Sequence, residues 1–113
     1  MKTDSIRVVV VEPEKAPEIR IIANELQELQ SIVKGYIEIF YLGTTLEGKI
    51  YGVCNEEGKL QGLEPNRLIV NMQDWICGPF LIAIVNDEGD FIDMPEVTAD
   101  FIASDFTERI IIL

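Results

Sequence analysis

Short runs of β-branched and aromatic residues, separated by turn residues, constrain the fold of this chain more than any other feature. Residues 6–11 read IRVVVV, a run typical of a strand that is buried on both faces. Residues 18–22 alternate polar and apolar side chains, so they are expected to pair back onto the first strand as a hairpin. The same reasoning predicts further strands at residues 36–42, 49–54 and 80–85.

One helix is predicted over residues 25–34, where apolar side chains recur on a single helical face. Asn24 is expected to cap its first turn, with Gln27 three residues later as in a capping box. Lys34 suits the negative end of the helix dipole. Gly35 is expected to be the left-handed residue that ends the helix.

A second helix is predicted over residues 97–106, because Val97, Phe101 and Ile102 have helical spacing. Its start is expected at one of three residues, Asp93, Pro95 or Thr98. The apolar tail that follows, residues 110–113, is expected either to form a terminal strand tucked into the sheet or to be an edge that needs a partner. The tucked strand is favoured.

Two similar turn signals, NEEG at residues 55–58 and NDEG at residues 86–89, indicate hairpins. Gly58 is expected to take a positive φ to close the first of them. Residues 62–67 are expected to form a turn or a single helical turn. Together these elements predict one α+β domain over residues 1–113, with a largely antiparallel sheet of five or six strands, one main helix packed on it and a short C-terminal helix.

Composition places this domain in a broad class and compartment. A hydrophobic content of 48% with 26% charged residues is globular rather than disordered. Cys54 and Cys77 match no zinc or redox spacing and are expected to be buried, reduced thiols. No apolar run is long enough to span a bilayer, and the first residues do not resemble a secretory signal. A cytoplasmic protein is therefore expected.

The charge of the chain is −11, and it is distributed unevenly. No Lys or Arg occurs between Leu68 and Glu108, a stretch that contains nine carboxylates. Such a stretch repels nucleic acid and attracts basic surfaces, so direct nucleic-acid binding is not expected. On charge alone a solubilising role is favoured. If the stretch does bind, the expected partner is a host protein with a basic surface. The residues expected to contact the partner are Asp87, Glu88, Asp90, Asp93, Glu96 and Asp100.

The sequence offers little support for catalysis or for a cofactor. Histidine is absent, which removes the commonest general base near neutral pH and the usual nucleophile–base pairs. The acidic residues around Gly89 do not have the spacing of an EF-hand loop, and the glycines do not form a phosphate-binding motif. We therefore expect a protein that is not an enzyme and that has no cofactor or catalytic residue.

A few polar or aromatic residues interrupt the apolar runs. Asn55, Gly58, Asn66 and Arg67 lie in the expected polar turns. Arg67 is expected to clamp backbone carbonyls or a carboxylate, with a ligand site as the alternative. Trp75 is expected to fill the core, with an exposed interface anchor as the alternative.

Five segments resemble those of an uncharacterised family of small proteins, domain-of-unknown-function family 3846. They are VVVEP at residues 9–13, LQSIVKGYIE at 29–38, CNEEGKL at 54–60, GLEPNR at 62–67 and GPFLI at 78–82. The resemblance implies a setting in phages, plasmids or conjugative elements of Gram-positive bacteria, and no assigned activity. The loop at residues 42–49 and the tail at residues 109–113 depart from the family pattern.

These observations lead to a functional expectation with one alternative. We expect a non-enzymatic accessory protein of a mobile element that binds a host protein, in its most specific form an acidic inhibitor or nucleic-acid mimic directed at a host defence enzyme. If the acidic stretch only solubilises the protein, the interface should lie at Trp75, residues 42–49 or the tail. The alternative function is a small-ligand or metal-binding domain that uses the polar turns.

Overall fold

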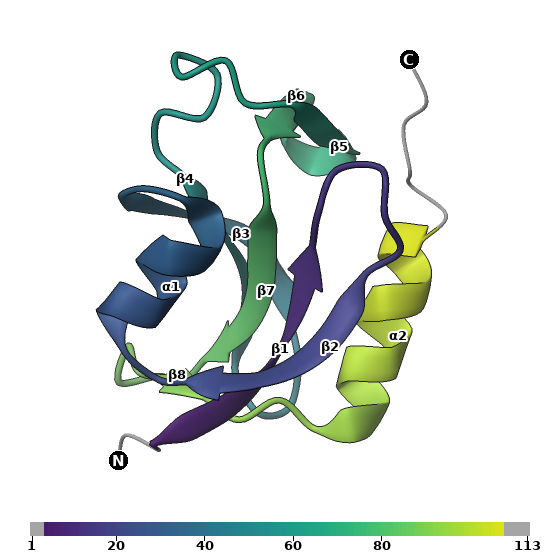
Figure 1. The fold of residues 1–113 in the computed structure, drawn as a ribbon. Coiled ribbons are helices and arrows are strands. Elements are labelled where there is room, and N and C mark those ends of the chain that lie inside the picture. Colours follow the sequence, from purple (N-terminus) through teal and green to yellow (C-terminus); the bar gives the residue numbers. More distant parts are fainter. Residues whose placement is uncertain (1–3, 108–113) are drawn as a thin grey trace.

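The computed structural model describes residues 4–107, which form three layers (Figure 1). A mainly antiparallel sheet lies in the middle, helix α1 (Leu26–Val33) covers one face and helix α2 (Glu96–Thr107) lies on the other. The predicted α+β class is therefore confirmed, with a helix on each side of the sheet.

The main sheet has six strands, all antiparallel to their neighbours, in the order β2-β1-β7-β4-β3 with β8 also paired to β7. Strand β7 is central because it pairs with three other strands. The strands are β1 (Ser5–Val11), β2 (Glu18–Ala23), β3 (Ile37–Thr44), β4 (Lys49–Asn55), β7 (Phe80–Val85) and β8 (Phe91–Ile92). Strands β2 and β3 form the two edges.

A separate two-stranded sheet consists of β5 (Pro65–Ile69) and β6 (Asp74–Cys77), joined by the 3₁₀ turn η1 (Val70–Met72). The prediction of a turn over residues 62–67 was therefore wrong in its second half. Pro65 is compatible with the start of a strand, because its missing N–H lies where no ladder bond is needed.

Strand β1 divides the apolar residues between two cores on opposite sides of the sheet. Val8 and Val10 face α1, whereas Val9 and Val11 face α2 and the β5–β6 sheet, and all four are at most 2% exposed. The prediction that residues 6–11 form a strand buried on both faces is confirmed. The alternation follows from the period of two along a strand.

Helix α1 lies where the sequence predicts it, but its two ends are built differently. The N-cap residue is Glu25 and not Asn24, and Glu25 makes no side-chain capping bond. The buried side chain of Asn24 donates to the carbonyl of Phe91 in β8 at 3.0 Å. The left-handed residue at the C-terminus is Lys34, with φ 67°, and not Gly35. At Gly35 a Cβ would lie 2.7 Å from the side-chain nitrogen of Asn55, so close packing accounts for that glycine.

Helix α2 confirms the second predicted helix and follows Pro95, but of the three residues that gave the helical spacing only Ile102 is buried. Ala99, Ile102 and Phe106 are buried against the sheet, whereas Val97 and Phe101 are 77% and 75% exposed. The apolar spacing of Val97 and Phe101 therefore marks an outward stripe.

The two turn signals have different outcomes. Residues 86–89 close the β7–β8 hairpin, with Gly89 at φ 87°. Residues 55–58 close no hairpin, because β4 pairs with β3 and β7. Gly58 is not among the glycines with positive φ; instead, a Cβ there would lie 2.5 Å from the carbonyl oxygen of Cys77.

The remaining predictions concern burial and the chain ends. Cys54 is buried as predicted, but Cys77 and Trp75 are only partly buried, and both cysteines are free thiols. The apolar tail, residues 110–113, lies outside the described residues. Within residues 4–107, no helix is both long enough and apolar enough to cross a membrane.

Candidate functional site

A groove lies beside α2, on the half of the sheet that this helix leaves open. Helix α2 packs over β1 and β2, so the side of β3 and β4 that faces the same way is not covered by it. The groove has a volume of about 470 Å³. Its lining is mostly apolar and comes from five elements and one turn: Leu42, Thr44, Thr45, Ile50, Ile69, Ile82, Val97, Thr98, Phe101, Ile102, Asp105 and Phe106.

Two parallel stripes on α2 border this groove. Val97, Phe101 and Asp105 recur every fourth residue and line the groove, so they form one stripe along the helix. Glu96 and Asp100 each precede a member of that stripe and therefore form an acidic stripe about 100° further around the helix. Apolar and acidic side chains are thus exposed next to each other on α2.

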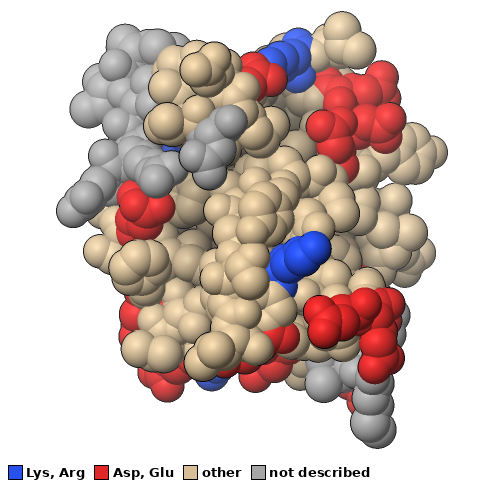
Figure 2. Space-filling view, turned by 180° about the vertical axis from the view of Figure 1, so that it is seen from behind, with Lys and Arg blue, Asp and Glu red and all other residues tan. Residues whose placement is uncertain are grey.

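Figure 2 views the molecule from the side of β3, the edge strand that is farthest from the reader in Figure 1. Uncharged residues dominate the middle of this face, and most of the carboxylates gather toward its margins. One basic side chain lies within the uncharged area. A largely uncharged surface with carboxylates toward its margins is therefore exposed on this side.

The six acidic residues predicted to bind a partner fall into two groups. Asp87, Glu88 and Asp90 lie in the β7–β8 turn, where the side-chain oxygen of Asn86 accepts the backbone N–H groups of Glu88 and Asp90 at 2.9 and 3.0 Å. Glu96 and Asp100 lie on α2, and both are exposed.

Asp93 lies between these groups and has a structural contact. Its carboxylate accepts the backbone N–H of Arg7 at 2.6 Å and lies 4.0 Å from the guanidinium of the same residue. Asp93 thus attaches the segment before α2 to the start of β1. Replacing it would disturb the fold as well as any interface.

Asp74, also in the acidic stretch, has its charge paired. Lys59 donates a hydrogen bond to its carboxylate, and the backbone N–H of Trp75 donates another at 2.8 Å. These two bonds lower the pKa of Asp74, the lysine having the larger effect. The acids of this stretch that lie within the described residues therefore do not form one uniform face.

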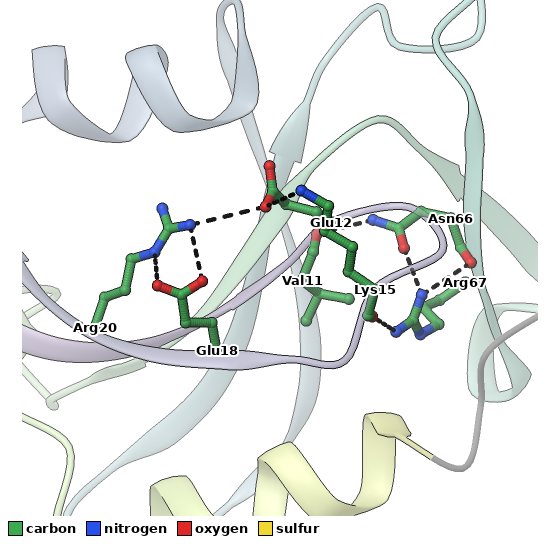
Figure 3. Close-up of polar contacts among 7 residues, drawn as sticks. All are labelled: Val11, Glu12, Lys15, Glu18, Arg20, Asn66 and Arg67. Atoms are coloured by element: carbon green, nitrogen blue, oxygen red, sulfur yellow. Dashed lines mark hydrogen bonds and ion pairs between the residues drawn. The ribbon is translucent and has the colours of Figure 1, made fainter.

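Asn66 and Arg67 form the predicted clamp (Figure 3). The Asn66 side chain donates to the carbonyls of Val11 and Gly78, both at 2.9 Å, and joins the end of β1 to the start of β7. Arg67 is fully buried and donates to the carbonyls of Phe106 at 3.1 Å and Lys15 at 2.7 Å, and to the side-chain oxygen of Asn66 at 2.8 Å.

The clamp is internal to the fold. Burial lowers the pKa of the Arg67 guanidinium, because desolvation disfavours the charged form. Three carbonyl-type oxygens stabilise it instead, one of them at the negative end of α2. Within residues 4–107, no buried side-chain nitrogen or oxygen lacks a hydrogen-bond partner.

Asn55 has a similar structural role at the end of α1. Its side-chain nitrogen donates to the carbonyls of Val33 and Lys34 at 3.1 and 3.2 Å, and its oxygen accepts the backbone N–H of Glu57 at 2.7 Å. It therefore caps the helix and fixes the turn after β4 at the same time.

A second cavity, of about 350 Å³, lies beside this turn. Its lining includes Gly58, Lys59 and Trp75, together with the two cysteines. Asn66 and Arg67 do not line it, so the predicted polar residues are divided between a cavity and an internal clamp. Across the described part of the chain, no three Cys, Asp or Glu side chains gather in a way that could hold a metal ion.

Cys54, in the wall of this cavity, is expected to react slowly with alkylating reagents in the folded protein. Burial, and then the negative charge of Glu38, raise the pKa of its thiol to about 11. The thiolate fraction at pH 8 should fall on the order of a hundredfold relative to an ordinary thiol. Peptide mapping after iodoacetamide treatment should show at least that slowing compared with the unfolded chain. Equal labelling rates in the two states would contradict the burial.

Comparison with known proteins identifies the family. The model of a domain of unknown function, DUF3846, matches residues 6–109. The chain belongs to this family. The resemblance drawn from the segments at residues 9–82 is thus confirmed. No curated protein and no solved structure matches the chain, so the DUF3846 assignment carries no established activity with it.

Sequence reasoning missed most of the groove. Residues 42–49 were singled out as an alternative interface, and Leu42, Thr44 and Thr45 do line it. Ile50 lies in a predicted strand and Ile69 in no predicted element, and no local signal places them on one surface. Only the outward position of Phe101 could have been predicted from helical periodicity, because Phe101 does not share a helical face with Ala99, Ile102 and Phe106.

Proposed function

We propose that this chain is a non-enzymatic accessory protein that acts by binding another protein through the groove beside α2. The observation that carries the proposal is the pair of exposed apolar residues, Val97 and Phe101, at the mouth of an apolar groove. Exposed apolar patches with a polar margin are typical of interaction sites, and aromatic residues contribute much of the binding energy at interfaces.

The charge supports a basic partner. A net charge of −11 attracts basic surfaces over several ångströms and repels nucleic acid. Asp100, which is exposed beside the groove, lies where basic residues of a partner would reach it. In its more specific form, the proposal is an inhibitor from a mobile element that occupies the basic surface of a host defence enzyme.

The decisive experiment removes the two exposed apolar side chains. Capture from a Gram-positive host lysate should yield a partner whose affinity, remeasured with purified proteins, weakens at least about tenfold in the Val97→Ser, Phe101→Ser double variant. The matched control is Leu60→Ser with Val70→Ser, which alters residues that are 85% and 63% exposed elsewhere. Equal affinities for the two double variants would contradict the proposal.

The acidic component is tested separately by charge reversal. Replacing Asp87, Glu96 and Asp100 by Lys should abolish binding, and wild-type affinity should fall as salt is raised. The corresponding Asn and Gln substitutions should give an intermediate loss, because they remove attraction without adding repulsion. Affinity indifferent to salt and to reversal would leave the carboxylates with a solubilising role only.

The second cavity supports an alternative function, the binding of a small ligand beside the turn at residues 55–58. Trp75 and Lys59 in its wall provide an apolar ring and a cation. A thermal-shift screen with metals and nucleotides would favour this alternative if one compound raised the unfolding temperature by several degrees. The same compound should then have no effect on Trp75→Ala.

A further inference from the structure

The two edges of the main sheet differ in how well they resist pairing with another strand. Strand β2 exposes Ile19 by 38% and Ile21 by 60%, but it also carries Glu18 and Arg20, whose side chains pair at 2.8 Å. Arg20 also lies 3.8 Å from Glu12 (Figure 3). Charged side chains of this kind protect an edge. Strand β3 has one charged residue, Glu38, and exposes Ile39 by 50% and Tyr41 by 51%.

The backbone of β3 offers hydrogen bonds on its free side. The N–H of Glu56 donates to the carbonyl of Tyr36 at 2.9 Å, one step before the register pair Ile37 and Asn55. Bonded and non-bonded pairs alternate in an antiparallel ladder, so the N–H and C=O groups of Ile37, Ile39 and Tyr41 point away from β4. Among the described strands, none pairs with β3 on that side.

The side chains of β3 suit an added strand on both faces. Ile39 and Tyr41 lie on the α1 side, where the Tyr41 ring packs 5.9 Å from that of Tyr51. Leu42 and Thr44 line the groove on the α2 side. A strand added to β3 would therefore cover exposed apolar area on one face and extend the wall of the groove on the other.

We propose that β3 is a strand-addition site for an extended segment of another protein in which apolar and basic residues alternate. The inference rests on the proposed function and names the partner's class. Exposed carboxylates lie at both ends of β3, with Glu47 at one and Glu56 and Glu57 at the other, and Glu38 lies between them. Together they outnumber the exposed Lys34 and Lys49 nearby.

Charge also argues against a second copy of this chain as the occupant. Two copies would each carry −11, and β3 pairing with itself would bring their acidic margins together. A basic segment would be attracted by the carboxylates around β3, whereas a second copy of the chain would be repelled by them. Main-chain hydrogen bonds would supply affinity, and the alternating side chains would supply specificity.

The direct test uses a fluorescein-labelled peptide of alternating isoleucine and lysine, eight residues long to match β3. It should bind wild-type protein and slow amide exchange at Ile39 and Tyr41 at least about tenfold. N-methylation of one alternate set of its amides should abolish binding, and methylation of the other set should not, because only one set faces β3. The charge control is a peptide of the same composition in which the isoleucines and the lysines occur in adjacent pairs and therefore do not alternate. Equal effects of the two methylated sets, or equal binding of the control, would overturn the proposal.

A matched pair of protein variants provides the second test. Ile39→Pro removes an outward N–H from β3 and spares the bonds to β4. Ile21→Pro likewise removes an outward N–H from β2. The backbone N–H of Asn24 donates to the carbonyl of Asp4 at 2.9 Å, and counting from this bonded pair places the N–H of Ile21 on the side away from β1. Only Ile39→Pro should abolish peptide binding. If either variant fails to fold by circular dichroism, the methylated peptides on wild-type protein still decide the question.

The outcomes separate this inference from the proposed function. A partner that is weakened by the Val97 and Phe101 variants but indifferent to Ile39→Pro would leave the groove as the interface and reject strand addition. Wild-type dimers in sedimentation that disappear in Ile39→Pro would also reject it, since the occupant would be a second copy. Loss of peptide and partner binding in Ile39→Pro alone supports it.

Discussion

Arg67→Met should destabilise the folded protein by about 3–5 kcal/mol, the largest effect expected from a single substitution in this chain. Methionine fills much of the space but donates no hydrogen bond. The carbonyls of Phe106 and Lys15 would each lose a donor, and the end of α2 would lose its attachment to β5. Urea unfolding followed by far-UV circular dichroism measures the change.

The control for this prediction is another arginine with ion-pair partners. Arg20→Met removes contacts to Glu18 and Glu12 that are exposed to solvent, so it should cost no more than about 1 kcal/mol. Arg67→Lys should lie between wild type and Arg67→Met, because one ammonium group cannot reach all three acceptors. A midpoint for Arg67→Met equal to that of Arg20→Met would show that the clamp contributes little.

Gly52→Ala should be the second large effect, at about 2–4 kcal/mol. Gly52 lies opposite Phe40 in the β3–β4 ladder, and a Cβ there would lie 2.0 Å from the ring of Phe40. The ring is buried in the core beside Phe80, with centroids 6.1 Å apart, so it cannot move aside without losing that packing. The free energy of unfolding from urea titration gives the result.

Gly43→Ala is the matched control in the neighbouring strand. Nothing lies within 4 Å of a Cβ at Gly43, and its φ is not positive, so the change should stay within about 0.5 kcal/mol. In a Phe40→Leu background, Gly52→Ala should cost at least about 1 kcal/mol less than in wild type, since the two residues are in contact. Strict additivity of the two substitutions would contradict this account.

The elements that sequence reasoning placed correctly are those specified by local pattern. Strands β1, β2, β3, β4 and β7, both helices and the turn at residues 86–89 follow from runs of β-branched residues, helical spacing and turn residues, each within a few neighbours. The errors lie where contacts with distant groups decide the role of a residue. Asn24 has the chemistry of a cap, but its side-chain nitrogen donates to the carbonyl of Phe91 in β8, and Glu25 is the N-cap residue.

Gly58 illustrates the same limit. A glycine after Asn-Glu-Glu predicts a positive φ, but the structure places the carbonyl of Cys77 where a side chain would be. The sequence correctly indicated that a glycine is needed at position 58, but it did not show why, because a glycine serves equally for backbone freedom and for the close approach of another group. The β5–β6 sheet was missed for a related reason, since its pairing depends on contacts that short apolar runs do not specify.

The sequence by itself determined the net charge, the absence of histidine, the α+β class, the principal strands and the family, because these depend on composition or on neighbours along the chain. Only the tertiary structure decided that the acidic residues fall into separate groups and that Arg67 joins β5 to the end of α2. It also decided that Val97 and Phe101 border a groove and that β3 is an edge strand whose exposed side chains are mostly uncharged. These features depend on which elements become neighbours in space, and long-range packing sets that arrangement.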